Sequence, residues 1–247
     1  VEKNELITKQ KQQIVSSIQY ASRIQKAVLP PEEYVIKIVP QHFILNKPRD
    51  IVSGDYYWTT QRGKESIIAV ADCTGHGVPG AFMSMLGISF LNQIVNKRAK
   101  SDSHKILDEL RDQVIKSLHQ TGREDEAKDG MDIALCVINL EDNILQYSGA
   151  HNPLFFIRNG ELQEIKADKM PIGIQSFGFI KKEIRPFTKK EIEIKPGDVF
   201  YIFSDGYMDQ FGGPNTKKFG VRRFKELLLE IHTDPMEVQQ GKLNKAI

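Results

Sequence analysis

The 247-residue sequence has only two cysteines, Cys73 and Cys136, and both lie in apolar, strand-like segments. Two such thiols do not make the disulfide framework of a small secreted domain, so we expect reduced cysteines and a cytoplasmic protein. No signal peptide and no apolar run that we would expect to cross a bilayer is evident. The sequence opens inside a helical pattern, so we expect a fragment of a longer protein, with a sensor or membrane anchor upstream.

An excess of charge of one sign is also missing. The 34 lysines and arginines nearly balance the 32 aspartates and glutamates, for a net charge of +2. This balance argues against a nucleic-acid partner, because such proteins carry a basic stripe or patch. No Gly-x-x-x-x-Gly-Lys loop indicates nucleotide binding. The composition, with 40% hydrophobic and 27% charged residues, is that of a soluble globular protein large enough to bury a substantial core.

Three aspartates stand out by their position. Asp72 follows the apolar run 67–71, where a carboxylate is costly unless something pairs with it. Asp55 lies next to a glycine in segment 53–58, and Asp205 ends the apolar run 199–203 beside another glycine. Few His or Cys residues lie near them. Oxygen-only ligand sets of this kind suit Mg²⁺ or Mn²⁺ better than zinc or copper.

The pattern of apolar residues predicts an α+β protein. Strands are expected at 40–72 with a turn at 61–65, at 132–140, 144–150, 154–158 and 161–165 as an antiparallel meander, within 178–197, and up to residue 205. Helices are expected at 78–95, 102–120, 219–231 and 235–246, the first apolar nearly all round and therefore buried. Segment 122–130 is charged and is expected to be a loop. Two packed sheets flanked by helices follow from this order.

Residues 1–29 predict one polar helix, which ends at the prolines that follow. Ile7, Ile14, Ala21 and Val28 recur every seven residues, the spacing of a coiled-coil seam. The seam is imperfect at Lys11 and Gln25. A dimeric coiled coil is the leading interpretation, and a helix packed on its own domain is the alternative.

Four motifs in order resemble the SpoIIE/RsbU branch of the metal-dependent protein phosphatases, the PPM family. They are Ser-Gly-Asp-Tyr at 53–56, Ala-Asp-Cys-Thr-Gly-His-Gly at 71–77, Ser-Gly-Ala-His-Asn-Pro at 148–153 and Phe-Ser-Asp-Gly at 203–206. Each motif alone is weak, but together they span roughly residues 40–247. The resemblance implies a four-layer α-β-β-α sandwich of two mainly antiparallel sheets, preceded by an N-terminal helix. The expected boundaries are 1–31 for a helical dimerisation or switch segment and 32–247 for the phosphatase domain.

The resemblance also implies roles for individual residues. Asp72 would bridge two Mn²⁺ or Mg²⁺ ions, with the backbone carbonyl of Cys73 as a further ligand, and Asp55 and Asp205 would complete the set directly or through water. Gly75 and Gly77 would leave space for the phosphate. Members of the family usually carry a further Asp-Asp pair near the C-terminus, and no such pair follows Asp209 here. The second metal site is therefore the less certain of the two.

Two histidines have alternative interpretations. His76 could act as the general acid for the leaving oxygen, but a loop histidine with a local hydrogen bond is favoured, and His151 is expected to be a turn residue joining two strands. Asp132, which starts a strand, is expected to cap or support rather than to bind metal.

The leading function is a bacterial serine/threonine protein phosphatase regulated through its N-terminal helix, acting on a STAS-type anti-sigma-factor antagonist. The alternatives are a dimeric signalling scaffold with little or no activity and, less favoured, a metal-dependent nuclease or cyclase.

Overall fold

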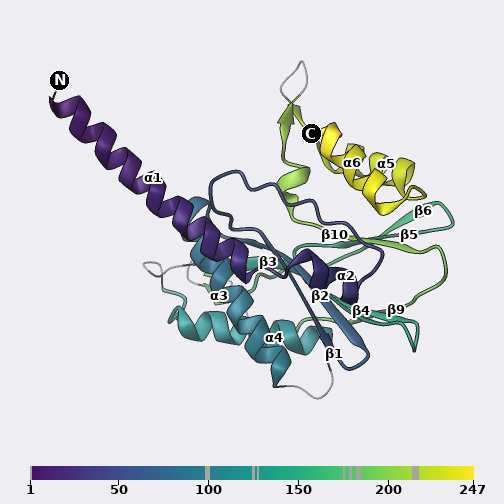
Figure 1. Ribbon diagram of the computed structural model, residues 1–247. Coiled ribbons are helices and arrows are strands. Elements are labelled where there is room, and N and C mark those ends of the chain that lie inside the picture. Colours follow the sequence, from purple (N-terminus) through teal and green to yellow (C-terminus); the bar gives the residue numbers. More distant parts are fainter. Residues whose placement is uncertain are drawn as a thin grey trace.

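The structure is a computed structural model that describes residues 2–97, 101–123, 126, 128–174, 176–177, 180–181, 185–212 and 217–247. Two antiparallel sheets pack on each other (Figure 1). The first has the order β1 (Tyr56–Arg62), β2 (Glu65–Cys73), β3 (Met131–Asn139), β4 (Ile144–Ala150), β9 (Lys190–Glu193). The second has the order β10 (Val199–Ile202), β5 (Leu154–Arg158), β6 (Glu161–Ile165).

Helices cover the outer faces of both sheets. The helices are α1 (Glu2–Val28), α2 (Glu32–Ile38), α3 (Gly77–Asn96), α4 (Ser103–Ser117), α5 (Val221–Ile231) and α6 (Met236–Ala246). Helices α3 and α4 pack on the first sheet, and α5 and α6 share a core with the second. The remaining elements are the 3-10 turn η1 (Asp205–Tyr207) and two short hairpins, β7 (Ser176–Phe177) with β8 (Ile180–Lys181) and β11 (Phe211–Gly212) with β12 (Lys217–Lys218).

Strand β3 shows how the layers arise from the sequence. Successive side chains of a strand point to opposite faces. Ile133 and Leu135 therefore enter the core under α3 and α4, whereas Ala134 and Cys136 enter the core between the two sheets. All four are at most 3% exposed. A strand buried on both faces reads as a continuous apolar run, and the predicted four-layer sandwich with its N-terminal helix is confirmed.

The predicted meander needs correction. Strands β4, β5 and β6 lie where the alternation placed them, but β4 belongs to the first sheet and β5 to the second. The chain changes sheets at His151, whose φ of 57° is left-handed. Such a φ is uncommon outside glycine and turns the chain sharply within a few residues.

The predicted strands between residues 40 and 55 are also wrong, because β1 begins only at Tyr56 and the helix α2 precedes the segment. Phe43 and Leu45 of this segment pack against the core of the second sheet. Their burial explains the apolar character that suggested a strand.

Two element ends differ as well. Strand β10 stops at Ile202, and Asp205 begins η1 instead of ending the strand. The predicted turn at 61–65 is shorter, with only Gly63 and Lys64 between β1 and β2. Parts of two predicted segments, at 124–125 and 127 and at 178–179 and 182–184, lie outside the described residues.

Helix α3 is less buried than its composition predicted. Met83 and Leu91 are buried, but Phe82 is 73% exposed, because only one side of the helix meets β2 and α4. By length and composition α3 could cross a membrane, which corrects the expectation that no such run exists. Its packing in the main core accounts for that composition, since core helices of globular proteins pass the same test.

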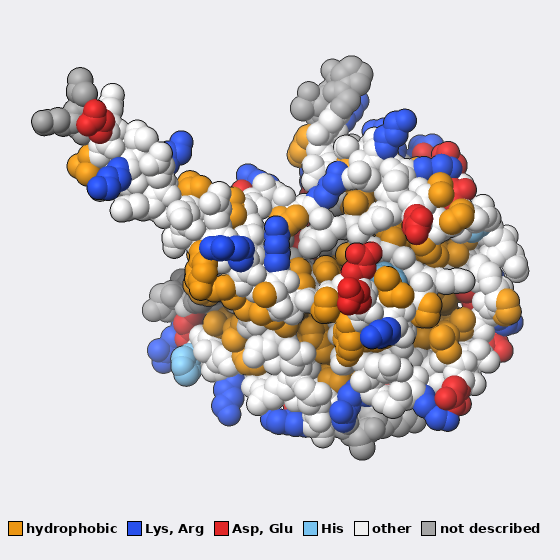
Figure 2. Space-filling model, in the orientation of Figure 1, with side chains coloured by type: hydrophobic (Ala, Val, Ile, Leu, Met, Phe, Trp, Pro, Cys, Tyr) orange, Lys and Arg blue, Asp and Glu red, His pale blue; other side chains and the backbone are white. Residues whose placement is uncertain are grey.

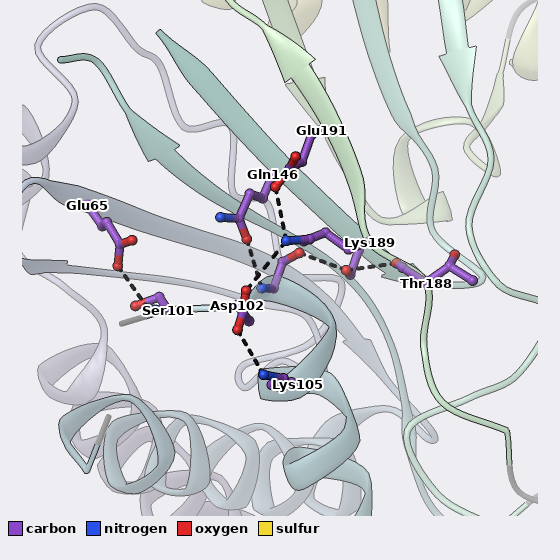
Figure 3. Close-up of polar contacts among 10 residues, drawn as sticks. Glu65, Ser101, Asp102, Lys105, Gln146, Thr188, Lys189 and Glu191 are labelled. Atoms are coloured by element: carbon purple, nitrogen blue, oxygen red, sulfur yellow. Dashed lines mark hydrogen bonds and ion pairs between the residues drawn. The ribbon is translucent and has the colours of Figure 1, made fainter. Parts of the chain in front are cut away.

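The N-terminus of α4 is joined to the first sheet by a polar network (Figure 3). Ser103 Oγ lies 2.8 Å from Ser148 Oγ of β4, which donates to the carbonyl of Thr188 at 2.9 Å. Lys189 lies between Asp102 and Glu191. These contacts join β4, the edge strand β9 and the segment before β9 to the N-terminus of α4.

Candidate functional site

The hairpin of β1 and β2 brings Asp55 and Asp72 together. Tyr56 pairs with Ala71 in the antiparallel register, so Asp55 lies just beyond the end of β1, next to Asp72 near the end of β2. The turn at the other end of the hairpin has Gly63 at a φ of +57°, which glycine adopts without steric cost. The prediction that this hairpin would place both carboxylates at one end is confirmed.

Asp205 lies just after the last strand of the second sheet. It follows β10 and starts η1, and its neighbours on both sides approach Asp55. Ser204 Oγ donates a 2.6 Å hydrogen bond to Asp55 Oδ2, and a Cβ added to Gly206 would lie 3.6 Å from the same oxygen. The site therefore lies where the ends of the two sheets meet.

The three carboxyl groups interact strongly. Burial raises the pKa of Asp72 first, and the charges of Asp55 and Asp205 and hydrogen bonds with both raise it further, to about 8. Like charges held this close disfavour ionisation unless a cation or a proton compensates. Asp72 is thus the electrostatic centre of the cluster.

The cluster is not a finished cation cage. Within the described residues, no group of three or more His, Cys, Asp or Glu side chains is already arranged to hold a metal ion. The backbone holds the three carboxyl groups close enough to couple electrostatically, and small side-chain rotations would bring them onto one centre. The oxygen-only donor set fits Mn²⁺ or Mg²⁺.

The loop after Asp72 is packed backbone against backbone. A Cβ on Gly80 would lie 2.6 Å from the carbonyl oxygen of Gly75 and 3.0 Å from Cα of Gly54. Gly75 and Gly77 have left-handed φ values of 86° and 62°. The glycines therefore let the loop, the first turn of α3 and the segment before β1 meet closely.

Cys73 contributes to this region through its backbone. Burial raises the pKa of its thiol far above the usual value, with further contributions from Asp72 and Asp55, so the sulfur stays protonated. Its side chain is 4% exposed within the main core. Its carbonyl oxygen lies 3.2 Å from the place of a Cβ on Gly54. A protonated, buried thiol is a poor metal ligand, which leaves the carbonyl as the donor that Cys73 can offer.

His76 lies on the solvent side of the loop. Its Nδ1 is 3.2 Å from Asp50 Oδ2, and its side chain is 74% exposed. The expected local hydrogen bond is present, but its partner is a carboxylate rather than the backbone. Asp50 had no signal in the sequence that marked it as a neighbour of this loop.

His151 and Asp132 form a separate pair. His151 Nδ1 lies 2.8 Å from Asp132 Oδ1, and the backbone N–H of His151 donates to the carbonyl of Asp168 at 2.9 Å. The hydrogen bond to Asp132 is the main cause that raises the pKa of His151. Asp132 also pairs across the ladder with Asp72, so the pair supports the strand that carries the central carboxylate. His151 is the turn residue that the sequence predicted, and the supporting role of Asp132 stays a prediction.

Ser204 is the neighbour of the aspartates that the sequence analysis missed. It directly precedes Asp205, so the signal was present in the motif at 203–206. Its hydrogen-bond partner Asp55 could not be predicted from the sequence, because Asp55 is 149 positions away.

Comparison with known proteins points to one family. Residues 62–244 match the family model described as Stage II sporulation protein E (SpoIIE). The chain is 25% identical to the phosphoserine phosphatase RsbU of Bacillus subtilis (strain 168) over 203 residues. This aligned region covers 79% of this chain and 54% of that protein. The chain thus spans about half the length of this curated relative.

Two solved structures are similar over most of the chain. The SiaA-PP2C domain of Pseudomonas aeruginosa has 31% sequence identity and a TM-score of 0.82, covering 95% of this chain and 89% of that one. The PP2C phosphatase domain of SpoIIE from Bacillus subtilis, solved with a fragment of its regulatory domain, has 20% identity and a TM-score of 0.63. It covers 84% of this chain and 59% of that one, and at this identity it shows the fold alone.

Proposed function

The chain belongs to the SpoIIE family, and from this membership we propose that it hydrolyses phosphoserine or phosphothreonine in a phosphorylated protein with bound Mn²⁺ or Mg²⁺. The resemblance to SpoIIE/RsbU-type phosphatases of the PPM family, first drawn from four short motifs, is confirmed. The single observation that carries the proposal is the cluster of Asp55, Asp72 and Asp205, to which both sheets contribute.

In this proposal, separate residues hold the metal ions and bind the phosphate. Asp55, Asp72 and Asp205 would hold the ions together with the carbonyl of Cys73. Bound divalent cations activate water and neutralise phosphate oxygens in enzymes of this kind. Gly75 and Gly77 would leave room for a phosphate beside the loop. Helix α3 begins directly after this loop, and the N–H groups of its first turn would favour a phosphate oxygen there.

His76 is the proposed proton donor to the leaving oxygen. Its Nδ1 faces the carboxylate of Asp50, so Nδ1–H is the donor in that hydrogen bond. In the imidazolium form, Nε2 carries the proton that a leaving alkoxide requires. The exposure of the ring keeps Nε2 accessible to a protein-bound phosphate.

A phosphorylated STAS-type anti-sigma-factor antagonist is the proposed substrate. The support is indirect, since RsbU is named a phosphoserine phosphatase and the substrate class was implied by the family resemblance. A protein substrate also suits a site that lies at the surface where two sheets end, because a docked partner can present a phosphorylated side chain there.

The N-terminal helix supports a second part of the proposal, a homodimer formed through residues 1–31. The N-terminal part of α1 projects beyond the rest of the protein with hydrophobic side chains on its surface (Figure 2). Leu6, Ile7 and Ile14 are 57%, 52% and 61% exposed. Helices rarely leave such a stripe to solvent, and a second α1 packed in register would cover it. The same stripe is the observation that favours a dimeric signalling scaffold as the second candidate function.

One assay tests the phosphatase. The protein is incubated with p-nitrophenyl phosphate and with a phosphoserine protein in Mn²⁺, in Mg²⁺ and in EDTA, beside Asp72→Asn. We expect turnover that needs the metal and disappears in the variant, while circular dichroism shows an unchanged fold. Equal turnover in EDTA, or in Asp72→Asn, would contradict the assignment, and a dimer without any turnover would favour the scaffold.

A further inference from the structure

The C-terminal half of α1 packs on the body of the protein through a polar residue. The side of α1 that meets the domain carries Val15, Ile18, Ser22 and Gln25, and Leu29 follows directly after the helix. Gln25 is only 8% exposed, and a buried amide group is costly unless its donors and acceptor are satisfied. The sequence had marked Gln25 as a flaw in the coiled-coil seam, but it faces the domain and not the seam.

Gln25 holds the backbone N–H and C=O of a single residue, Ser53. Its Nε2 donates to the carbonyl of Ser53 at 2.6 Å, and its Oε1 accepts from the N–H of Ser53 at 3.0 Å. The side-chain amide therefore pairs with this backbone as a neighbouring strand would. The second hydrogen of Nε2 is donated to Ser84 Oγ at 2.8 Å.

Ser84 extends the junction to α3. Its side chain is fully buried, and its hydroxyl lies 3.2 Å from the carbonyl of Ser53 and 2.9 Å from that of Ala81. The single hydroxyl hydrogen of Ser84 is shared between these two carbonyls, so the backbone of Ser53 contacts polar side chains of both α1 and α3. A satisfied buried network of this kind has few alternative arrangements, because each lost hydrogen bond leaves an unpaired polar group.

Ser53 lies two residues before Asp55. Between them, Gly54 is pressed against the acidic loop, since a Cβ there would lie 2.9 Å from the carbonyl oxygen of Gly75 and 3.2 Å from that of Cys73. A shift of Ser53 therefore moves Asp55 and changes the contact with the loop that follows Asp72.

We propose that Gln25 is a positioning residue for the cation site, which it governs by fixing the backbone of Ser53 and, through it, Asp55 and the carbonyl of Cys73. The proposal rests on the proposed function only in assuming that the aspartates hold a divalent cation. It assigns a residue of the N-terminal helix to the site, so that a domain cut at residue 32 would lack part of its own support.

The test measures Mn²⁺ binding directly, by titrating the electron paramagnetic resonance signal of free Mn²⁺. Gln25→Met keeps the size and removes all three hydrogen bonds. The matched control is Gln240→Met, because Gln240 Nε2 donates to the carbonyl of Ile44 at 2.8 Å. Ile44 belongs to the same segment between α2 and β1 as Ser53, but it lies further from Asp55 along the chain. Supporting partners of metal ligands typically change affinity by about 10- to 100-fold. We expect at least about 10-fold weaker Mn²⁺ binding in Gln25→Met and less than about 2-fold in Gln240→Met.

A second variant and a second readout test the same role of Gln25 independently. Ser84→Ala removes one hydroxyl from the junction and should weaken Mn²⁺ binding in the same direction by a smaller factor, even where Gln25→Met folds poorly. With turnover as a second readout, Gln25→Met should require more Mn²⁺ for half-maximal activity while kcat at saturating Mn²⁺ stays near that of the parent protein.

The outcomes separate the two proposals. Equal Mn²⁺ affinity in the parent protein and in folded Gln25→Met, or an equal loss in Gln240→Met, would overturn the role of Gln25 and leave the phosphatase standing. Mn²⁺ binding that weakens in Gln25→Met, in a protein without any phosphatase activity, would support the role and contradict the proposed function.

Discussion

Ser204 donates a 2.6 Å hydrogen bond to the carboxylate of Asp55, although the two residues are 149 positions apart in the sequence. Asp55 belongs to the end of the first sheet and Ser204 follows the last strand of the second. This contact fixes the orientation of one carboxylate and joins the two sheets at the candidate site.

Ser204→Ala should weaken the cation site without unfolding the protein. The loss of the hydroxyl frees the Asp55 carboxylate to rotate, and we expect the Mn²⁺ concentration for half-maximal turnover to rise about 10-fold. Ser204→Thr keeps the hydroxyl and is the matched control. An unchanged Mn²⁺ requirement in Ser204→Ala would show that the backbone alone orients Asp55.

Asp72 predicts a pH dependence of the metal-free protein. Its pKa rises from an ordinary carboxyl value to about 8 in the fold. The folded state therefore binds more protons than the unfolded state between about pH 4 and pH 8, so the free energy of unfolding falls as the pH rises through that window. Thermal unfolding in EDTA should show this fall, and Asp72→Asn should flatten it. A parent protein and variant with the same slope would contradict the coupling.

His151 predicts a second, distinct dependence. Its hydrogen bond with Asp132 raises the pKa of the imidazole above its usual 6.5. The stabilisation is fully present below pH 6.5 and is lost as the pH rises through the raised pKa. His151→Asn removes the titration while tolerating the left-handed backbone. The melting temperature of the variant, with metal bound, should no longer carry this component, and an unaltered profile would argue against the pair.

Gly80 predicts a steric limit. A Cβ at this position would lie 2.6 Å from the carbonyl oxygen of Gly75, so Gly80→Ala must displace the acidic loop. We expect a loss of about 1–3 kcal/mol in the free energy of unfolding. Gly241→Ala on α6, where nothing lies within 4 Å, should instead gain about 0.5–1 kcal/mol. Chemical denaturation of both variants checks this, and equal effects would refute the steric argument.

The exposed stripe of α1 predicts an oligomeric state. Ile14→Glu places a charge at a position that is 61% exposed, so it should weaken dimerisation without affecting the domain. Gln12→Glu adds the same charge on another side of the helix. Light scattering should report a smaller mass only for Ile14→Glu. An identical mass for both variants and the parent protein would reject a dimer through this seam.

Local patterns predicted much of this fold. The turn at Asn159 and Gly160, both left-handed, separates β5 from β6 at the residues where the alternation stops. The aspartates could be found because a carboxylate at the end of an apolar run is unusual wherever it occurs. Both signals lie within a few residues of the feature that they mark.

Contacts between distant segments could not be predicted in this way. Phe43 and Leu45 looked like strand residues because burial without a strand leaves the same apolar pattern. Gln25 was interpreted as a polar residue that interrupts the coiled-coil seam. Its partner is the backbone of Ser53, and a backbone partner cannot be identified from residue types in the sequence. The ligand roles of the aspartates remain predictions that the proximity of the three carboxyls supports.

The division of the aspartates between the two sheets also has a consequence for biosynthesis. Asp55 and Asp72 leave the ribosome together, on one hairpin, while Asp205 follows only after the rest of the first sheet and all three strands of the second. A nascent chain therefore carries the carboxylates of Asp55 and Asp72 long before that of Asp205 has been synthesised. The cluster cannot form completely until nearly the whole domain has emerged. Assembly of the cluster is then a late event that reports the correct docking of one sheet on the other.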